Sequence, residues 1–174
     1  MATHEVLLIA GRSGVGKSTV AWEVSEQLRA AGVAHCVVEG DLMGQVHPAP
    51  ADDPDRSAIT ERNLAAVWAN FAALGHHRLI YTNTVSVLEG AMFQRAMGGG
   101  PLRIVRVLLT ADDVTARARL TQRETGSQLA PHIERSGLMA RHLARHAPED
   151  TVRVPTDGRP IVDIARQVVA ATGW

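Results

Sequence analysis

The chain has 174 residues, a formal net charge of zero, 45% hydrophobic residues and 21% charged residues. This is the composition of an ordinary globular domain, and we expect one compact domain over residues 1–174. No apolar run approaches the roughly 20 residues of a membrane helix, and no basic stripe is present, so we expect neither a membrane nor a nucleic-acid partner. Because residues 1–10 lack the pattern of a signal peptide, we expect a cytoplasmic protein. We also expect either a monomer or a homodimer.

In chain order, apolar runs bounded by turn residues alternate with longer segments of helical periodicity. Strands are predicted over residues 5–10, 34–39, 78–82, 103–109 and 152–154. Helices are predicted over residues 17–30, 58–74, 88–96, 111–123, 133–146 and 161–171. This alternation is typical of an α/β fold with three layers, in which helices cover both faces of a doubly wound, parallel, five-stranded sheet.

Two segments are predicted as loops. Residues 43–56 contain three prolines among three aspartates, which excludes a continuous helix and favours a flexible loop on the acceptor side. Residues 124–131 carry Thr-Gly-Ser between two helical stretches, which suggests a hinged lid.

The most specific pattern is Gly11-Arg12-Ser13-Gly14-Val15-Gly16-Lys17-Ser18, which fits G-x-x-x-x-G-K-[ST] between a strand and a helix. Backbone N–H groups of such a loop form an anion nest at the positive end of a helix. The pattern predicts a P-loop NTPase that binds ATP, with Lys17 on the β- and γ-phosphates and Ser18 on Mg²⁺. The nucleotide-binding residues expected here are Gly11, Ser13, Gly14, Val15, Gly16, Lys17, Ser18 and Thr19.

Lys17 is the only lysine among the 18 basic residues. A compact ammonium fits among phosphate oxygens where a planar guanidinium would not, which supports a role on phosphate. The guanine-reading motif Asn-Lys-x-Asp needs a second lysine, so a GTPase is disfavoured.

With this motif, Glu39-Gly40-Asp41, the Arg117-x-Arg119 pair and Thr156-Asp157-Gly158-Arg159, the chain resembles the small-molecule kinases of the nucleoside monophosphate kinase fold. Gluconate, shikimate, adenylylsulfate and chloramphenicol kinases are relatives of this kind, as are AAA-type ATP-binding proteins of unassigned substrate. The resemblance implies the strand order 2-3-1-4-5.

In such kinases the second strand often ends in an acid close to the substrate hydroxyl. We expect Asp41 to orient the attacking hydroxyl as a catalytic residue and to help hold Mg²⁺ together with Ser18. A position in a solvated turn or at a helix cap is the alternative for Asp41. Glu39 either takes part directly in the site or only makes hydrogen bonds to the backbone or to Lys17. The third strand has no Walker B acid, and Asn83 or Thr82 stands there instead.

Arg117, Arg119 and Arg123 fall where the resembling kinases carry lid arginines. Arg119 and Arg123 share a helix face and are expected to be catalytic, whereas Arg117 points elsewhere and is expected on the nucleotide. A solvated face is the alternative for each arginine.

The resemblance also places the adenine ring near residues 156–160, where Asp157, Gly158 and Arg159 are expected to bind the nucleotide. A plain turn that enters the last helix is the alternative.

Three functions remain open. The first is an ATP-dependent phosphotransferase that moves the γ-phosphoryl group to a hydroxyl of a small non-nucleotide molecule. The second is a nucleoside or nucleoside monophosphate kinase, which the lack of arginine over residues 42–55 disfavours, although Arg56 and Arg62 follow. The third is an ATP-dependent switch without phosphotransfer, which the missing Walker B acid supports.

Overall fold

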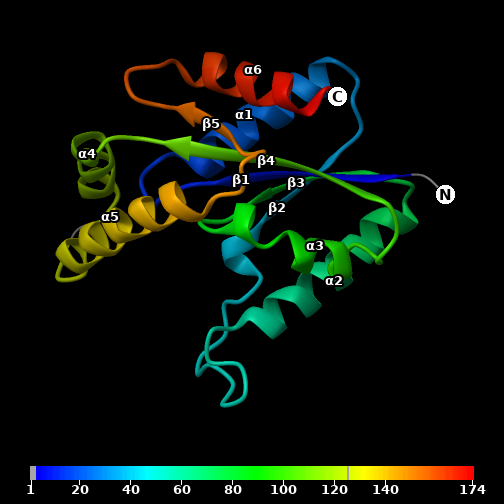
Figure 1. Cartoon of the computed structure of the whole chain (residues 1–174), viewed down its shortest axis with the longest axis horizontal. Helices are drawn as coiled ribbons and strands as arrows, with labels where there is room; N and C mark the ends of the chain where they lie inside the picture. The colour runs from blue at the N-terminus through cyan, green and yellow to red at the C-terminus, as the bar shows by residue number, and fades with distance from the viewer. Residues whose placement is uncertain (1–2, 125) are drawn as a thin grey trace.

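The computed structural model describes residues 3–124 and 126–174 (Figure 1). Its centre is a five-stranded sheet in the order β2-β3-β1-β4-β5, in which every neighbouring pair is parallel. The strands are β1 (His4–Ala10), β2 (Cys36–Glu39), β3 (Arg78–Thr82), β4 (Leu102–Thr110) and β5 (Val152–Pro155). The predicted fold class and strand order are confirmed.

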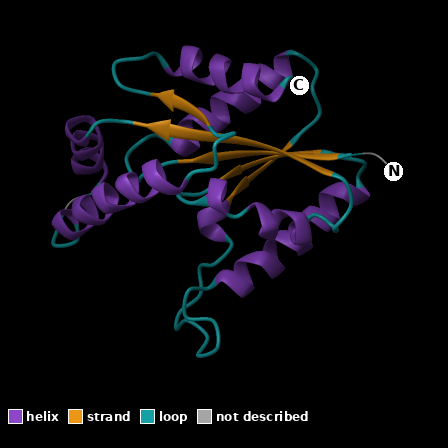
Figure 2. Cartoon of the chain, viewed as in Figure 1, coloured by secondary structure: helices purple, strands orange, loops and turns teal. Residues whose placement is uncertain are grey.

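Helices cover both faces of the sheet (Figure 2). They are α1 (Lys17–Ala30), α2 (Ser57–Ala73), α3 (Gly90–Ala96), α4 (Asp113–Arg123), α5 (Leu129–His146) and α6 (Ile161–Thr172), with short 3₁₀ turns η1 (Gly40–Leu42) and η2 (Ser86–Leu88). Helices α1 and α6 pack together on one face, and α2 and α3 lie on the other (Figure 1). Within the described residues, no helix is both long and apolar enough to cross a membrane.

The central strand β1 owes its place to an unbroken apolar run. Residues 6–10 of this strand are fully buried, as expected for a parallel strand that is covered on both faces. Val6 and Leu8 face the cluster of α2 and α3, whereas Leu7 and Ile9 face α1 and α6. The strand therefore delivers the loop after Ala10 to the carboxyl edge of the sheet, where α/β proteins bind ligands.

The predicted helix over residues 88–96 is interrupted. Leu88 ends the 3₁₀ turn η2, Glu89 follows it, and α3 begins at Gly90. Helix α5 begins at Leu129 and not at residue 133, so residues 129–131 of the predicted lid form its first turn. Thr125, in the same predicted lid, lies outside the described residues.

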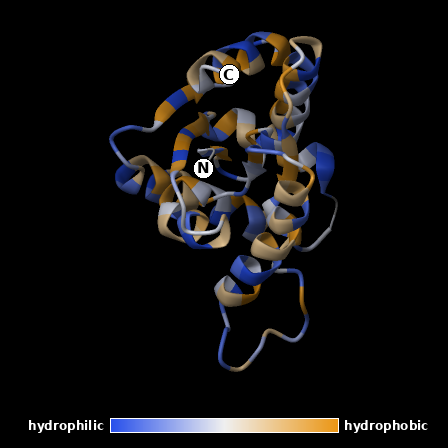
Figure 3. Cartoon of the chain, turned by 90° about the vertical axis from the view of Figure 1, so that its right-hand side faces the viewer, coloured by the Kyte–Doolittle hydropathy of each residue, from blue (hydrophilic) through white to orange (hydrophobic). Residues whose placement is uncertain are grey.

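The loop of residues 43–56 projects from the body of the molecule (Figures 1 and 3) and mixes hydrophilic with hydrophobic residues. It is tied to α2 by Asp53, which is 7% exposed. The Asp53 carboxylate accepts hydrogen bonds from the N–H groups of Ala58 and Ile59 and from the Ser57 hydroxyl. Asp53 thus satisfies free N–H groups in the first turn of α2.

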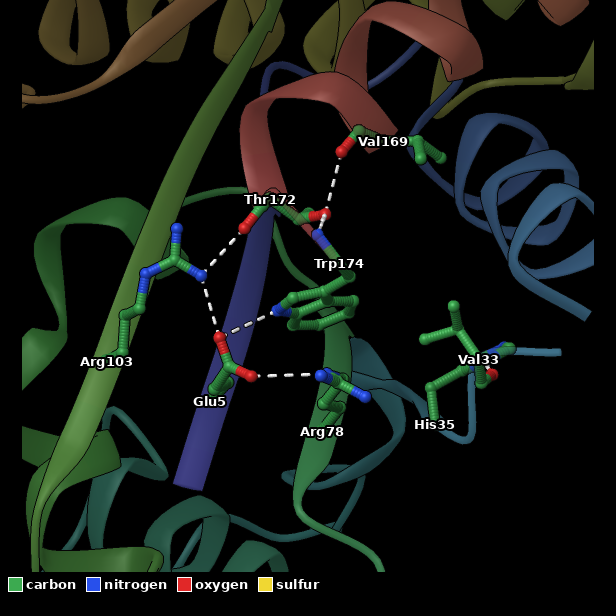
Figure 4. A network of polar contacts seen from close by, with 8 residues as sticks. All are labelled: Glu5, Val33, His35, Arg78, Arg103, Val169, Thr172 and Trp174. Atoms are coloured by element: carbon green, nitrogen blue, oxygen red, sulfur yellow. Dashed lines mark hydrogen bonds and ion pairs between the residues drawn. The ribbon is translucent and has the colours of Figure 1, made fainter. Parts of the chain in front are cut away.

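The amino end of the sheet is tied to the C-terminus by Glu5 (Figure 4). Glu5 Oε2 accepts hydrogen bonds from Arg103 at 2.7 Å and from the Trp174 indole at 2.9 Å, and Oε1 accepts one from Arg78 at 3.1 Å. Arg103 also donates to the Thr172 carbonyl, at the end of α6. This network fixes the edge of the sheet opposite to the phosphate loop.

Candidate functional site

The phosphate loop, residues 11–18, connects β1 to α1 as predicted. Gly16 caps α1 in the left-handed conformation, with φ at 98°. The first N–H groups of a helix have no intrahelical partner, and no acidic residue lies in the first turn of α1. These N–H groups and the helix dipole together can bind an anion.

Gly14 is required because the loop lies against α4. A Cβ atom at this position would lie 2.8 Å from the Ala116 carbonyl oxygen and 3.0 Å from Leu120. The φ of Gly14 is also 87°, which side-chain-bearing residues rarely adopt. The loop therefore packs directly on the helix that carries the arginines.

The Lys17 ammonium is held over the loop by backbone oxygens. Its Nζ donates to the carbonyls of Gly11 at 3.0 Å and Arg12 at 3.4 Å. Burial lowers the pKa of Lys17, and the charge of Arg123 lowers it further. The negative charges of Asp41 and Glu39 counteract part of this lowering. Lys17 is thus a partly desolvated cation whose bonds to the loop can be exchanged for bonds to phosphate oxygens.

The carboxylate that contacts Ser18 belongs to Glu39. Glu39 Oε2 accepts hydrogen bonds from the Ser18 hydroxyl at 3.0 Å and from the Thr82 hydroxyl at 2.7 Å. The expectation that Asp41 helps to hold Mg²⁺ together with Ser18 stays a prediction, and the carboxylate in direct contact with Ser18 is that of Glu39. Thr82 ends β3, where the Walker B acid is missing, and it orients a carboxylate from the neighbouring strand β2 instead.

Asp41 lies farther along the same edge, in η1. Its Oδ1 accepts a hydrogen bond from the Asn83 amide at 3.0 Å, and Asn83 Oδ1 in turn accepts one from the Val85 N–H. Asn83 thus caps the segment after β3 and also positions Asp41. The catalytic and metal-binding roles of Asp41 stay predictions.

A cavity of about 840 Å³ joins these parts, and we call it the phosphate-loop cavity. Its volume lies within the usual range of small-molecule sites. On one side it is lined by residues of the phosphate loop and of α4. On the other side it is lined by polar residues of η1, the 43–56 loop, α2 and the segment after β3, namely Asp41, Gln45, Asp55, Arg56, Thr60, Asn83 and Thr84.

The three lid arginines separate as their helical spacing predicts. Arg119 and Arg123 line the phosphate-loop cavity, whereas Arg117 lines a different cavity between α4 and α5. Arg119 donates to the Val15 carbonyl at 3.1 Å and to the Thr156 hydroxyl at 3.1 Å. Arg117 does not line the phosphate-loop cavity, so its expected role on the nucleotide stays a prediction that this geometry does not support.

Residues 157–159 form a turn ahead of α6. Asp157 accepts a hydrogen bond from the Asp112 N–H at 3.0 Å, and Arg159 donates to the Pro155 carbonyl at 2.8 Å. None of Asp157, Gly158 and Arg159 lines the phosphate-loop cavity, although Thr156 and Ile161 do. Their role in binding the base stays a prediction that this geometry does not support.

Arg12 was not predicted as a site residue, although it lies inside the motif. Its side chain is 5% exposed and donates from Nε to the Ser136 hydroxyl at 2.9 Å, while another guanidinium nitrogen pairs with Asp113. Ser136 donates to the Ser13 carbonyl at 2.8 Å, so α5 also holds the phosphate loop. Nothing in the sequence distinguishes Ser136 from other serines.

The oxygen donors near Ser18 fit Mg²⁺ that is bound together with nucleotide phosphates. Within residues 3–124 and 126–174, no group of three or more His, Cys, Asp or Glu residues could hold a metal ion alone. Mg²⁺, however, is usually bound by one or two carboxylates, with phosphate oxygens and water completing its shell. The Ser18 hydroxyl and the Glu39 carboxylate, which already share a hydrogen bond, provide such a set.

Several solved structures resemble this chain over nearly its whole length. A gluconokinase from Sinorhizobium meliloti 1021 has a TM-score of 0.63 and 19% identity, with 99% of this chain and 94% of that chain covered. The Deinococcus radiodurans tunicamycin resistance protein has a TM-score of 0.62 and 20% identity, with 98% and 96% covered. The Mycobacterium tuberculosis APS kinase in complex with AMPPNP and APS has a TM-score of 0.53 and 20% identity, with both chains fully covered.

At these identities the likeness shows a shared fold. No curated protein sequence matches the chain. A family model described as "AAA domain" matches residues 6–148, which include the phosphate loop, the carboxylates of β2 and η1, and helices α4 and α5. The chain therefore belongs to this AAA domain family.

Proposed function

We propose that the chain is an ATP-dependent kinase that phosphorylates a hydroxyl group of a small non-nucleotide molecule. The observation that supports this most is that a single cavity contains both the phosphate loop and Asp41. A nucleotide switch needs only the phosphate-loop half of such a cavity. The polar half around Asp41 gives an acceptor a place to bind beside the γ-phosphate.

In the proposed reaction, the acceptor oxygen forms a bond to the γ-phosphorus while the bond from that phosphorus to the bridging oxygen breaks. ADP leaves, and the hydroxyl proton passes to Asp41. Lys17, Arg119 and Arg123 surround the transferred group and stabilise its charge. Mg²⁺, held by Ser18 and Glu39, would neutralise charge on the phosphate oxygens when bound.

The lining of the acceptor half supports a hydroxyl-rich molecule over a nucleoside. Gln45, Thr60 and Asn83 offer hydrogen-bonding groups, and Asp41 and Asp55 accept hydrogen bonds from hydroxyls. Proteins commonly bind bases by stacking them on aromatic rings. Among the described residues that line this cavity, His132 is the only one with a ring that could stack in this way.

One observation fits the second candidate, a nucleoside monophosphate kinase, as well as it fits a sugar-acid kinase. Arg56 lines the acceptor half although the preceding loop residues 42–55 lack arginine. Its Nε donates to the Val46 carbonyl, which leaves the terminal nitrogens for an anionic group. Arg56 could bind the phosphate of a nucleoside monophosphate or the carboxylate of a sugar acid equally well.

A turnover assay separates these functions. The protein is first screened by thermal shift against sugars, sugar acids, hydroxylated antibiotics and nucleoside monophosphates, with ADP and Mg²⁺ present. ADP release is then measured with ATP and each stabilising compound. Release accelerated by a non-nucleotide hydroxyl compound supports the proposal. Release accelerated only by nucleoside monophosphates would favour the second candidate, and release that no acceptor in the panel accelerates would count against both.

A further inference from the structure

A second cavity, of about 470 Å³, lies on the other side of the phosphate loop between α4 and α5. We call it the α4–α5 cavity. Its ionisable lining is more basic than acidic, with three arginines and two carboxylates. The lining residues that carry the argument are Arg12, Asp113, Arg117, Glu134, Gly137 and Arg141.

Arg12 brings a buried charge to this cavity. Its Nε and one terminal nitrogen are used by Ser136 and Asp113. The other terminal nitrogen has no hydrogen-bond partner within the described part of the chain and lies toward Gly137. The Arg12 side chain, which is only 5% exposed, therefore keeps one terminal nitrogen for a ligand.

Two guanidinium groups converge at Gly137. A Cβ atom built on this glycine would lie 3.6 Å from a terminal nitrogen of Arg141 and 3.7 Å from the remaining terminal nitrogen of Arg12. Neither Arg117 nor Arg141 has a carboxylate within ion-pair distance in residues 3–124 and 126–174. Asp113 pairs with Arg12 and also interacts electrostatically with Arg141, so one carboxylate is shared by two guanidinium groups. The three arginines of the lining outnumber its two carboxylates, and an added anion would offset the remaining positive charge.

We propose that the α4–α5 cavity binds a small molecule through an oxyanion, a carboxylate or a phosphate, held between Arg12, Arg117 and Arg141. The planar guanidinium fork suits both groups, which present two oxygens at matching spacing. The absence of a side chain at Gly137 gives that oxyanion its room. The cavity is distinct from the phosphate-loop cavity, with which it shares no lining residue.

Occupancy of this site is expected to affect the phosphate loop. Arg12 belongs to that loop, and its partner Ser136 holds the Ser13 carbonyl. A ligand that fixes Arg12 fixes these contacts as well. The ligand and ADP should therefore change each other's affinity by the same factor.

The test is made on protein saturated with ADP without Mg²⁺, so that free phosphate cannot occupy the phosphate loop and citrate cannot act by removing metal. Inorganic phosphate and citrate are titrated separately by calorimetry. Saturable binding of phosphate alone identifies a phosphate site, and binding of citrate alone identifies a carboxylate site. No saturable binding of either probe up to about 10 mM would overturn the proposal, because this limit corresponds to under about 3 kcal/mol of binding.

Variants locate the binding. The double variant Arg117→Ala/Arg141→Ala should lower the affinity for the bound probe at least tenfold. Gly137→Ala should weaken it as well, and its fold should survive because the new methyl meets only ordinary contact distances. Arg145→Ala removes an arginine of the same helix that does not line the cavity and should bind like the wild type.

If both test variants bind the probe as tightly as the wild type, the proposed site is wrong. It is also wrong if Arg145→Ala loses as much affinity for the probe as the test variants do. The coupling is tested by measuring ADP affinity with and without the bound probe. An ADP affinity that the probe leaves unchanged would overturn the link to the phosphate loop. Neither result depends on whether the chain is a kinase, because no turnover is measured.

Discussion

The Ser18 hydroxyl donates a hydrogen bond to the Glu39 carboxylate at 3.0 Å. Ser18 lies in the first turn of α1, and Glu39 ends β2 at the edge of the sheet. Thr82 donates to the same Glu39 oxygen from β3, the strand that pairs with β2. An acid from β2 therefore occupies the place beside Ser18 that an acid of β3 would otherwise take, while Asp41 stays with Asn83.

This division of the two carboxylates predicts that Glu39→Gln weakens the metal-dependent part of nucleotide binding. An amide keeps the hydrogen bonds but supplies no negative charge to Mg²⁺. ADP affinity should thus respond less to Mg²⁺ in the variant, while affinity without metal stays near that of the wild type. Calorimetric titration of ADP with and without Mg²⁺ measures this. An unchanged Mg²⁺ response would place the cation-binding carboxylate elsewhere.

Asp41→Asn is the matched variant and should behave differently. If Asp41 accepts the hydroxyl proton, acceptor-dependent turnover should fall by about 10² or more, while ADP affinity keeps its Mg²⁺ response. Steady-state rates over a range of acceptor and metal concentrations measure this. Rescue of the rate by excess Mg²⁺ or Mn²⁺ would instead assign a metal role to Asp41.

The sequence predicted the sheet and the phosphate loop well because both depend on local pattern. The apolar run of β1 and the spacing of the glycines with Lys17 each lie within a short segment. The pairing of Glu39 with Ser18 could not be predicted, because it depends on how far β2 extends at the sheet edge. The same holds for Arg12, whose partners Asp113 and Ser136 lie 101 and 124 residues away.

Lys17 offers a direct probe of the phosphate loop because it is the only lysine. Its pKa is lowered by burial, so a larger fraction of its amine is neutral and reactive at a given pH than for an exposed lysine. An amine-directed reagent should modify Lys17, and ADP should protect it. Mass spectrometry of the labelled peptide follows the reaction. Labelling that ADP does not slow would contradict the placement of Lys17 on phosphate.

Lys17→Ala should leave the fold intact and reduce turnover by about 10²–10³, as removal of a donor to the transition state does. Lys17→Arg is the matched control for charge. If shape matters as much as charge, the arginine variant should also lose most of the activity. Melting temperature and turnover of both variants are compared with the wild type. Turnover of Lys17→Ala within about threefold of the wild type would refute the assignment.

Gly40 lies between the two carboxylate residues, Glu39 and Asp41, and should not tolerate a side chain. A Cβ atom there would lie 2.5 Å from the Thr82 carbonyl oxygen and would also collide with the Tyr81 ring. Both neighbours belong to β3 and are buried, so we expect Gly40→Ala to cost about 1–3 kcal/mol and to displace Glu39 and Asp41. Gly100→Ala is the control, since nothing lies within 4 Å of its Cβ position. Urea unfolding of the two variants should separate them, and equal stability would contradict the packing.

The last prediction concerns stability at the opposite edge of the sheet, where Glu5 holds Arg78, Arg103 and Trp174 (Figure 4). Burial alone would raise the pKa of Glu5, but the hydrogen bonds from Arg103 and Trp174 and the charge of Arg78 outweigh it and lower the pKa below its ordinary value of 4.5. A carboxyl whose pKa is lower in the folded state stabilises the fold above the unfolded pKa, and this stabilisation is lost as the pH falls through the folded value.

Glu5→Gln should therefore lower the free energy of unfolding by about 2 kcal/mol at pH 7, the usual value for hydrogen bonds to a charged group. The difference from the wild type should stay constant down to about pH 5 and shrink below pH 4.5, because the unfolded wild-type chain takes up a proton there that the folded chain takes up only at lower pH. Glu26→Gln is the control, since Glu26 pairs with Arg29 on the surface, with both side chains at least 60% exposed, and such pairs contribute little. Urea unfolding at pH 7, 5 and 3.5 measures all three proteins. A difference that stays the same down to pH 3.5 would show that the Glu5 network does not act through its charge.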